Sequence, residues 1–346
     1  MSSLAYLHGK TVLVTGAAGT VGTALVDQLA ASPCRHVRAL DHSENELFYL
    51  FERIRSAGRV TPLVGDIRDF ERLRMAMSGV DIVFHAAALK HVELGEYNPS
   101  EVVETNLRGL QNVIRAALDA NVEKFVFTSS DKAVNPTNVM GASKMMGERL
   151  VTAANDSRGS RLTRFASVRF GNVLGSRGSV VPTFAHAAVR GEPLRLTHSE
   201  MTRYVMTVPE SAQLVLEAAS LMQGGEVFVT KMRAIRIADL AHVVADELCG
   251  DRVASEIVVT APRIGEKLYE ELLGLDEVER TYESIRLLIV LPKRDGSARG
   301  AGLPTGYGDV CRADREWHSG KDPCLTTEEL RTYLVQEGIL DPWKIA

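Results

Sequence analysis

The sequence has few cysteines, and they are not arranged in pairs. Cys34, Cys249, Cys311 and Cys324 are the only four in 346 residues. None of them has a cysteine or histidine companion at the spacing that disulfide frameworks or metal sites use. We therefore expect reduced thiols, no metal site and a cytoplasmic protein.

A basic surface and a long apolar run are also missing. The formal net charge is −4 and the sequence pI is about 6.2, so we expect no polybasic footprint for nucleic acid or for an anionic membrane. The sequence contains no run of about 18 apolar residues, and its first residues do not have the pattern of a signal peptide. Neither nucleic acid nor a membrane is therefore an expected partner.

A glycine-rich turn follows the first apolar segment. Residues 11–14 read as a short strand, and glycines recur at positions 16, 19 and 22 before a helical pattern begins. Glycine at these positions permits a tight turn, close approach of the backbone to a pyrophosphate, and close packing of helix on strand. The pattern predicts a dinucleotide-binding doubly wound (Rossmann) domain. The cofactor-binding residues expected from it are Gly16, Ala18, Gly19, Thr20, Val21 and Gly22.

An acidic residue ends the second predicted strand, which spans residues 36–40. Asp41 lies about 20 residues beyond the glycines, where a carboxylate accepts hydrogen bonds from the adenosine ribose hydroxyls. Because a carboxylate repels a 2′-phosphate and no Arg or Lys follows in His42-Ser43-Glu44, we expect NAD rather than NADP, with Ser43 beside it. The alternative is that Asp41 only caps the helix starting near Ser43.

Polar residues follow the apolar run at 125–127, where a buried strand is expected to end. These residues are Ser130, Asp131 and Lys132. Strands of open α/β sheets present ligand-binding groups at their carboxyl ends. A helix is predicted to begin near Asn138, and its Met140 and Lys144, four residues apart, share one face. We expect Lys144 to point back towards Ser130, Asp131 and Lys132.

The stretch SSDKAVNPTNVMGASK resembles the nucleotide-sugar 4,6-dehydratases of the polysaccharide-biosynthesis (CapD-like) family, which belongs to the extended short-chain dehydrogenase/reductase superfamily. In that superfamily the same corner carries Tyr-x-x-x-Lys, with the tyrosine as acid/base; here Met140 occupies the tyrosine position, as in some members of the family. Longer relatives carry membrane helices before the catalytic domain. The resemblance implies the catalytic set Ser130, Asp131, Lys132, Met140 and Lys144.

The resemblance covers residues 9–280 and implies further contacts. Glu93 and Ile264 stand where proline is common in the family. On the cofactor, the implied residues are Asp66 and Ile67 at the adenine, Ala86 and Ala87 near the nicotinamide, and Lys144. On the sugar nucleotide, the implied residues are Lys90, His91, Asn172, Arg177, Ser179, Val180, Arg203, Arg263 and Glu266, with the three arginines at its diphosphate and Glu266 at the uridine ribose.

Together these features predict an α/β protein in two parts. Residues 1–170 would form the Rossmann domain with the catalytic stretch, and residues 171–346 would form mainly a smaller α/β substrate-binding lobe, with some segments returning to the first domain. The leading hypothesis is an NAD-dependent UDP-N-acetylglucosamine 4,6-dehydratase, expected to form a homo-oligomer. The alternatives are a UDP-sugar epimerase on the same scaffold and, because of Met140, a non-catalytic NAD-binding protein.

Overall fold

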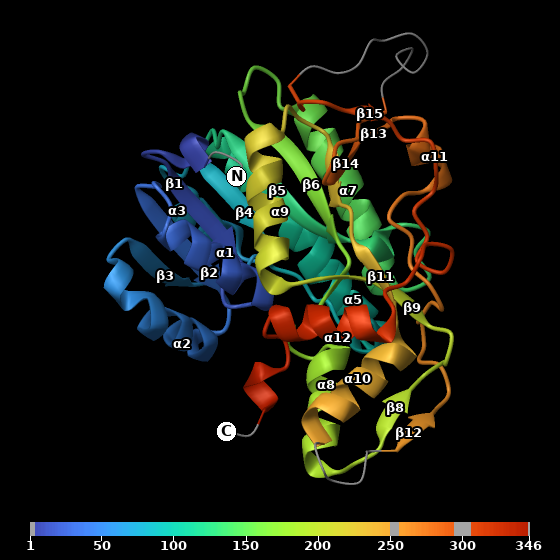
Figure 1. Cartoon of the computed structure of the whole chain (residues 1–346). Helices are drawn as coiled ribbons and strands as arrows, with labels where there is room; N and C mark the ends of the chain where they lie inside the picture. Colours follow the sequence, from blue (N-terminus) through green and yellow to red (C-terminus); the bar gives the residue numbers. More distant parts are fainter. Residues whose placement is uncertain (1–3, 250–255, 294–305, 345–346) are drawn as a thin grey trace.

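A computed structural model describes residues 4–249, 256–293 and 306–344 of the chain (Figure 1). A ten-stranded sheet dominates it, in the order β15-β13-β14-β10-β6-β5-β4-β1-β2-β3. The seven strands from β10 to β3 are parallel to one another. They are β1 (Thr11–Thr15), β2 (His36–Asp41), β3 (Val60–Val64), β4 (Ile82–His85), β5 (Lys124–Ser130), β6 (Arg164–Phe170) and β10 (Val227–Thr230).

The predicted doubly wound sheet is thus confirmed, and it is extended by an antiparallel edge. The strand next to β10 runs against it, and two further antiparallel strands follow. Residues 287–292 form an apolar run typical of a strand, but such a run does not reveal the direction of the strand. The three edge strands are β13 (Thr281–Glu283), β14 (Leu287–Val290) and β15 (Cys311–Arg312).

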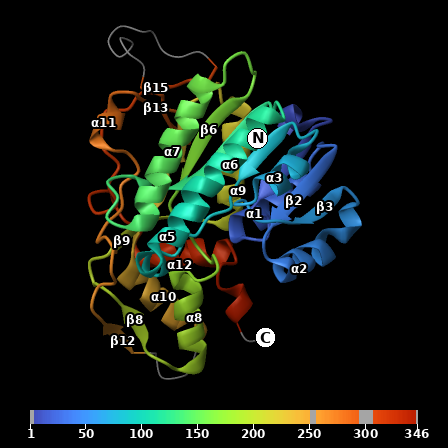
Figure 2. The ribbon, with the colours of Figure 1, turned by 180° about the vertical axis from the view of Figure 1, so that it is seen from behind.

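Helices cover both faces of this sheet (Figures 1 and 2). Strand β1 is buried along its whole length, as expected of a parallel strand between two helical layers. On one face lie α1 (Thr20–Ala30), α2 (Glu44–Ile54) and α9 (Val208–Leu221), and on the other α3 (Phe70–Met77), α6 (Leu110–Asp119) and α7 (Val139–Ser157). Shorter helical turns are η1 (Leu4–Leu7), η2 (Arg55–Ala57), α4 (Val92–Tyr97), η4 (Asp131–Ala133) and α11 (Leu275–Val278).

The helical segment from residue 99 to residue 119 contains an irregularity. Helix α5 (Pro99–Val102) leads into a π-helical turn (Val103–Gly109) that continues as α6. Such turns insert one extra residue into a helix and are frequent at functional sites. Here the turn carries Asn106, which is buried beside the loop after β4.

A smaller lobe with its own hydrophobic core lies below the large sheet in Figure 1. The predicted boundary at residue 170 falls at the end of β6, and β10 with β13 to β15 returns to the large sheet. The lobe's helices are α8 (Val180–Arg190), α10 (Ile237–Cys249), α12 (Thr327–Gln336) and η5 (Asp341–Trp343). Its strands are β7 (Asn172–Val173), β8 (Leu194–Leu196), β9 (Thr202–Met206), β11 (Arg233–Arg236) and β12 (Ile257–Val259).

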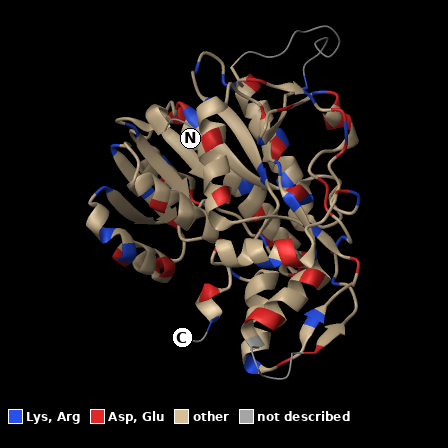
Figure 3. Cartoon of the chain, viewed as in Figure 1, with Lys and Arg blue, Asp and Glu red and all other residues tan. Residues whose placement is uncertain are grey.

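Charged residues of both signs are interspersed over the two lobes (Figure 3). None of the helices in the described ranges is long and apolar enough to cross a membrane. Cys34, Cys311 and Cys324 are unpaired thiols, and the side chain of Cys249 lies outside the described residues.

Candidate active site

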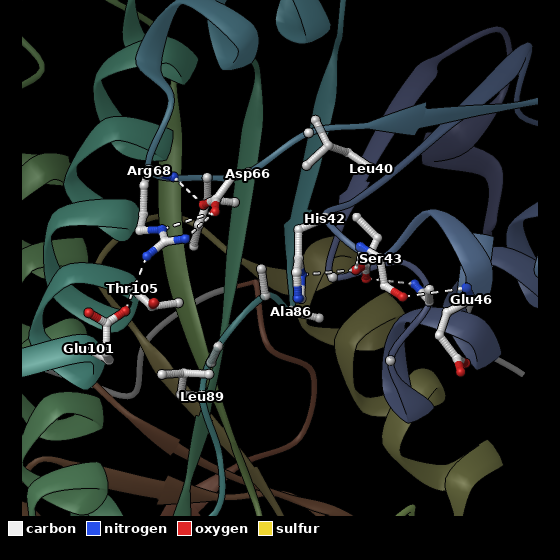
Figure 4. A pocket seen from close by; sticks show the side chains of 18 of the residues that line it. Leu40, His42, Ser43, Glu46, Asp66, Arg68, Ala86, Leu89, Glu101 and Thr105 are labelled. Carbon is white, nitrogen blue, oxygen red and sulfur yellow. Dashed lines mark hydrogen bonds and ion pairs between the residues drawn. The ribbon is translucent and has the colours of Figure 1, made fainter. Parts of the chain in front are cut away.

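A cavity of about 350 Å³ lies at the carboxyl ends of β1, β2 and β4 (Figure 4). It brings together nine of the residues predicted to bind the cofactor. They are Gly16, Ala18, Gly19, Asp41, Ser43, Asp66, Ile67, Ala86 and Ala87. Thr20, Val21 and Gly22 form the first turn of α1 instead, and Lys144 lies outside this lining.

Two of the glycines are required by close backbone approaches. Gly16 has a φ of +66°, and a Cβ there would lie 2.5 Å from the backbone nitrogen of Ala87. A Cβ on Gly22 would lie 2.0 Å from the carbonyl oxygen of Gly16. No side chain fits at either position. The compact turn that results can bring its backbone close to a pyrophosphate at the start of α1.

Asp41 joins the glycine turn to the end of β2. Its carboxylate accepts hydrogen bonds from the backbone nitrogens of Ala18 and Ser43, both at 3.0 Å. Ser43 is the residue that caps α2, by accepting from the nitrogen of Glu46 at 3.4 Å, so the alternative that Asp41 serves only as this cap is wrong. A carboxylate has about four acceptor positions, which leaves Asp41 capacity for ribose hydroxyls.

Two arginines that the sequence did not associate with Asp41 also line the cavity. Arg68 pairs with Asp66 at 2.7 Å and with Glu101 at 3.2 Å, and its hydrogen bonds hold the pKa of Asp66 below the ordinary value. Arg177 pairs with Glu46. Because both guanidiniums are already neutralised by carboxylates, neither creates a free positive site for a 2′-phosphate.

Arg177 also connects the substrate half of the chain to the glycine turn. Its guanidinium donates to the carbonyl oxygen of Ala18, and its backbone nitrogen donates to the Thr20 hydroxyl at 3.3 Å. Its carbonyl oxygen accepts from the Lys90 amine at 2.9 Å. The predicted substrate residue Arg177 therefore lies in the cofactor cavity.

Removal of the Arg177 side chain is expected to weaken binding of the dinucleotide. For Arg177→Ala we expect a dissociation rate about three- to tenfold faster than in the wild type, because exposed ion pairs contribute modestly. Fluorescence-detected release of the dinucleotide measures it, with Arg190→Ala as control, since Arg190 forms a similarly exposed pair with Glu192. An unchanged release rate for Arg177→Ala would show that the Arg177 side chain does not help to hold the dinucleotide.

The predicted pair Asp131 and Lys132 lies at the end of β5, with the carboxylate fully buried. One carboxylate oxygen of Asp131 accepts from the Ser130 hydroxyl at 2.8 Å and from the Lys132 amine at 3.0 Å. The same amine donates to the Asn172 side-chain oxygen at 3.1 Å and lies 3.3 Å from a carboxylate oxygen of Glu270. The structure thus brings together Ser130, Asp131, Lys132 and Asn172, and adds Glu270.

Lys132 is held in its charged form in this setting. Burial by itself would lower the pKa of its amine, but the carboxylates of Asp131 and Glu270 outweigh burial and raise that pKa. An ammonium ion hydrogen-bonded to Asp131 and facing Glu270 is therefore the resting form of Lys132. The 3.0 Å hydrogen bond joins the Lys132 amine directly to the Asp131 carboxylate.

Helix α7 begins as predicted, with Asn138 as its cap, and packs closely on this corner. A Cβ on Gly141 would lie 2.3 Å from the carbonyl oxygen of Lys132, so only glycine fits there. Met140 is buried on the same helix. Lys144 donates to the carbonyl oxygen of Thr128 at 2.8 Å. It therefore contacts β5 at Thr128 and does not reach Ser130, Asp131 or Lys132 as we expected.

Lys144 and Asn106 are two buried polar residues close to the start of α7. Burial lowers the pKa of Lys144 to about 8, opposed by the nearby Glu148. The Asn106 amide donates to the Leu89 carbonyl and to the Ser143 hydroxyl, both at 2.9 Å. Asn106 therefore fixes the loop after β4 against α7, and its hydrogen bonds go to these groups rather than to the lysine.

The remaining predicted substrate residues are spread along the lobe interface. Arg203 is buried and donates to the carbonyl oxygens of Thr202, Lys267 and Leu268 at 2.7 to 3.3 Å. Arg263 is exposed, 4.0 Å from Glu93. The guanidinium of Arg203 also lies 3.9 Å from Glu266, and a shared role of Arg177, Arg203 and Arg263 at one diphosphate stays a prediction. Glu266 accepts from the Arg263 backbone nitrogen at 3.2 Å.

Two further predicted substrate residues, His91 and Ser179, belong to the region around Arg177. The His91 ring faces Gly178, and a Cβ on Gly178 would lie 2.6 Å from this ring. Burial lowers the pKa of His91, and the nearby charge of Lys90 lowers it further. Ser179 precedes Val180, the first residue of α8, and its buried hydroxyl has no hydrogen-bond partner in the described part of the chain. An unsatisfied hydroxyl at a helix N-terminus suits an anionic ligand.

The dinucleotide cavity and the adjacent Asp131–Lys132 pair define an enzyme of the short-chain dehydrogenase/reductase class. The chain belongs to the family described as polysaccharide biosynthesis protein, whose model matches residues 12–292. It is 42% identical to the capsular polysaccharide biosynthesis protein CapD of Staphylococcus aureus over 289 residues, 81% of this chain but 48% of that protein. The chain thus spans about half the length of that relative.

Other relatives are similar over most of their length. A Campylobacter jejuni protein named UDP-N-acetylglucosamine 4,6-dehydratase (inverting) is 38% identical over 278 residues, 80% of this chain and 81% of that protein. A Rickettsia typhi protein named UDP-glucose 4-epimerase is 37% identical over 278 residues, 78% and 80% of the two chains. Dehydratases and epimerases thus share this scaffold.

Solved structures agree with the fold. The X-ray structure of Pen from Bacillus thuringiensis superposes with a TM-score of 0.89 at 37% identity, covering 96% of this chain and 99% of that one. DesIV, a dTDP-glucose 4,6-dehydratase from Streptomyces venezuelae solved with NAD and TYD, gives a TM-score of 0.68 at 25% identity, with 75% and 86% coverage.

Proposed function

We propose that this chain is an NAD-dependent UDP-N-acetylglucosamine 4,6-dehydratase, producing a UDP-4-keto-6-deoxy-N-acetylhexosamine. The observation that carries the proposal is the buried Asp131 carboxylate hydrogen-bonded to Lys132, which also contacts Asn172 of the substrate half. Elimination of water across C5 and C6 needs a base and an acid side by side, and these two residues supply them. The Campylobacter relative at 38% identity carries the name of this activity.

The two residues divide the elimination between them. Bound NAD would take up the C4 hydrogen with its electron pair and give it back at C6. After its proton has passed to Asp131, neutral Lys132 accepts the C5 proton while Asp131 protonates the departing C6 hydroxyl. Lys132 then returns a proton to C5, and the proton released from the C4 hydroxyl balances the one that leaves in water.

NAD is the dinucleotide that fits the cavity. The Asp41 carboxylate at the end of β2 disfavours a 2′-phosphate, and the two arginines of the cavity are paired with carboxylates. Related structures such as DesIV were solved with NAD. Mass spectrometry of the cofactor released on denaturation is expected to find NAD, and mainly NADP would refute the role given to Asp41.

Met140 leaves the oxidation at C4 without the usual tyrosine. A thioether neither donates nor accepts a proton usefully, and the candidates that remain are Lys144, the hydroxyls of Thr128 and Ser130, and water. Lys144 is favoured because its pKa of about 8 makes a sizeable fraction neutral near that pH. Below it the amine is mostly protonated, so turnover is expected to rise with pH towards 8.

Substitution at these two positions separates the roles. We expect Lys144→Ala to lower kcat by about 10²-fold or more, whereas Met140→Leu, which keeps a buried apolar side chain, retains most activity. Steady-state turnover with bound NAD quantified in each variant is the measurement. Wild-type-like turnover of Lys144→Ala would exclude the lysine as the base.

The sugar nucleotide is proposed to lie between the two lobes. The N-terminus of α8 with the unsatisfied Ser179 hydroxyl supports binding of the diphosphate near Val180. Lys90, His91, Arg203, Arg263 and Glu266 are the further candidates along this interface. A cytoplasmic homo-oligomer completes the proposal.

A UDP-sugar 4-epimerase is the second candidate, because Rickettsia relatives at 37% identity carry that type of name. Epimerisation needs no acid at C6, so it leaves the Asp131–Lys132 pair without a task. Mass spectrometry after incubation with UDP-N-acetylglucosamine distinguishes the two. A product lighter by one water supports dehydration, and a product of unchanged mass supports epimerisation.

A further inference from the structure

Glu270 lies outside the predicted catalytic set but faces its centre. Its side chain is 2% exposed. One carboxylate oxygen lies 3.3 Å from the Lys132 amine and 3.8 Å from the Arg203 guanidinium. The other oxygen has no hydrogen-bond partner among the residues that the structure describes, and the same holds for the second oxygen of Asp131. Lys132 is thus enclosed by two buried, half-satisfied carboxylates.

The position of Glu270 is fixed by its backbone. Its nitrogen donates to the hydroxyl of the fully buried Ser319 at 2.9 Å, and that hydroxyl is hydrogen-bonded to Thr202 of β9 at 2.9 Å. The carboxylate of Glu270 therefore reaches Lys132 from the second half of the chain, whereas Asp131 comes from the end of β5.

Four charged groups face this carboxylate. Lys132 and Asp131 come from η4, Arg203 from β9 and Lys267 from the same segment as Glu270. The Arg203 guanidinium donates to three backbone carbonyls and also lies 3.9 Å from Glu266. Lys267 donates to the Val134 carbonyl at 2.9 Å and pairs with Glu271 at 3.6 Å. Lys132 is accordingly the cation that responds most directly to the charge of Glu270.

The charge of Glu270 decides whether Lys132 can give up its proton. With both carboxylates ionised, the ammonium form of Lys132 is stabilised from two sides, and moving its proton to Asp131 leaves Glu270 as a buried anion without its cation. With Glu270 protonated, the same proton shift converts an ion pair into two neutral groups. Buried isolated charges are avoided in that state, so the catalytic arrangement becomes accessible.

We propose that Glu270 is a positioning residue that acts through Lys132: its protonated form permits transfer of the Lys132 proton to Asp131, and its ionised form holds Lys132 as an ammonium ion and stops elimination. The proposal rests on the dehydratase function proposed above. Burial raises the pKa of Glu270, opposed by Lys132, which is the direction that the protonated form requires. Glu270 itself exchanges no proton with the sugar.

The pH profile of kcat tests this role. The wild type is expected to give a bell, since activity requires neutral Lys144 and protonated Glu270. In Glu270→Gln, whose amide imitates the protonated carboxyl, we expect the falling limb to vanish, so that one pH unit above the wild-type midpoint of that limb the variant turns over about tenfold faster than the wild type. Glu270→Asp should keep a falling limb.

Glu271→Gln is the matched control, because Glu271 is the adjacent carboxylate and pairs with Lys267 and Asn135 rather than Lys132. It should keep the bell. A bell that persists in Glu270→Gln, or a folded, NAD-containing Glu270→Gln without activity at any pH, would overturn the proposal.

An infrared titration gives a readout independent of turnover. The wild type should show a carboxylic-acid band, absent from Glu270→Gln, that persists well above the pKa of about 4.3 typical of exposed glutamate. If Glu270 is ionised throughout the pH range in which the enzyme turns over, the proposal is wrong even when dehydration occurs. If the band is present but UDP-N-acetylglucosamine is not dehydrated, it is the proposed function that fails.

Discussion

Turnover of UDP-N-acetylglucosamine is expected to fall by about 10²–10⁴-fold when Asp131 is replaced by asparagine or Lys132 by alanine. Asparagine keeps the shape of Asp131 but cannot deliver a proton to the C6 hydroxyl, and alanine removes the group that accepts the C5 proton. Both side chains lie at the end of β5, outside the lining of the dinucleotide cavity. The bound NAD content should therefore match the wild type while product formation in both variants is lost.

Lys321→Ala serves as the control for this pair, because Lys321 is exposed and, among the residues that the structure describes, pairs only with the exposed Glu316. It should turn over like the wild type. Incorporation of deuterium at C5 in heavy water adds a second readout, which should disappear in Lys132→Ala. Near-normal dehydration by both Asp131→Asn and Lys132→Ala would remove the pair from the mechanism.

Removal of the Arg169 guanidinium is expected to lower the free energy of unfolding by about 3–5 kcal/mol. Arg169 of β6 is buried and donates to both carboxylate oxygens of Glu148 at 2.7 and 2.8 Å and of Glu277 at 2.6 and 2.7 Å. Arg169→Met leaves the buried Glu148 without this cation and leaves Glu277 with Arg280, 3.2 Å away. Urea unfolding followed by circular dichroism measures the loss.

The same triad predicts acid sensitivity. Burial would raise the pKa of Glu277, but Arg169 outweighs burial and lowers that pKa to about 2. Because the folded-state value lies below the ordinary 4.5, the stabilisation is complete above about pH 4.5 and is lost as the pH falls towards 2. The triple variant with Glu148→Gln and Glu277→Gln should recover part of the loss, and an Arg169→Met stability within 1 kcal/mol of wild type would contradict the argument.

Features encoded locally were the ones that the sequence predicted well. The spacing of the glycines, the apolar run before them and Asp41 at the end of β2 depend on neighbours within one β-α-β unit, and the structure confirms their convergence at one cavity. The start of α7 follows from Asn138, which accepts from the nitrogen of Gly141 at 2.7 Å. Asp131 and Lys132 are adjacent in the chain, so the strand end that carries one carries both.

Features that depend on distant segments were not predictable in the same way. Glu270 reaches Lys132 from a segment that reads, by itself, as a charged and solvated stretch. Arg177 was expected at the substrate diphosphate, but the loop before α8 brings its guanidinium to Glu46 and Ala18. The antiparallel edge of the sheet follows from packing after β10, and no local pattern of residues 281–290 fixes strand direction.

The central claim, removal of water with transfer of hydrogen within one sugar, is tested most directly by a substrate labelled with deuterium at C4. The wild-type enzyme should be incubated in ordinary water with UDP-N-acetylglucosamine labelled in this way, and the product analysed by NMR. The account predicts a 4-keto-6-deoxy product with the deuterium in the C6 methyl group. Deuterium retained at C4, in a product that keeps its C6 hydroxyl, would contradict it and leave epimerisation as the activity.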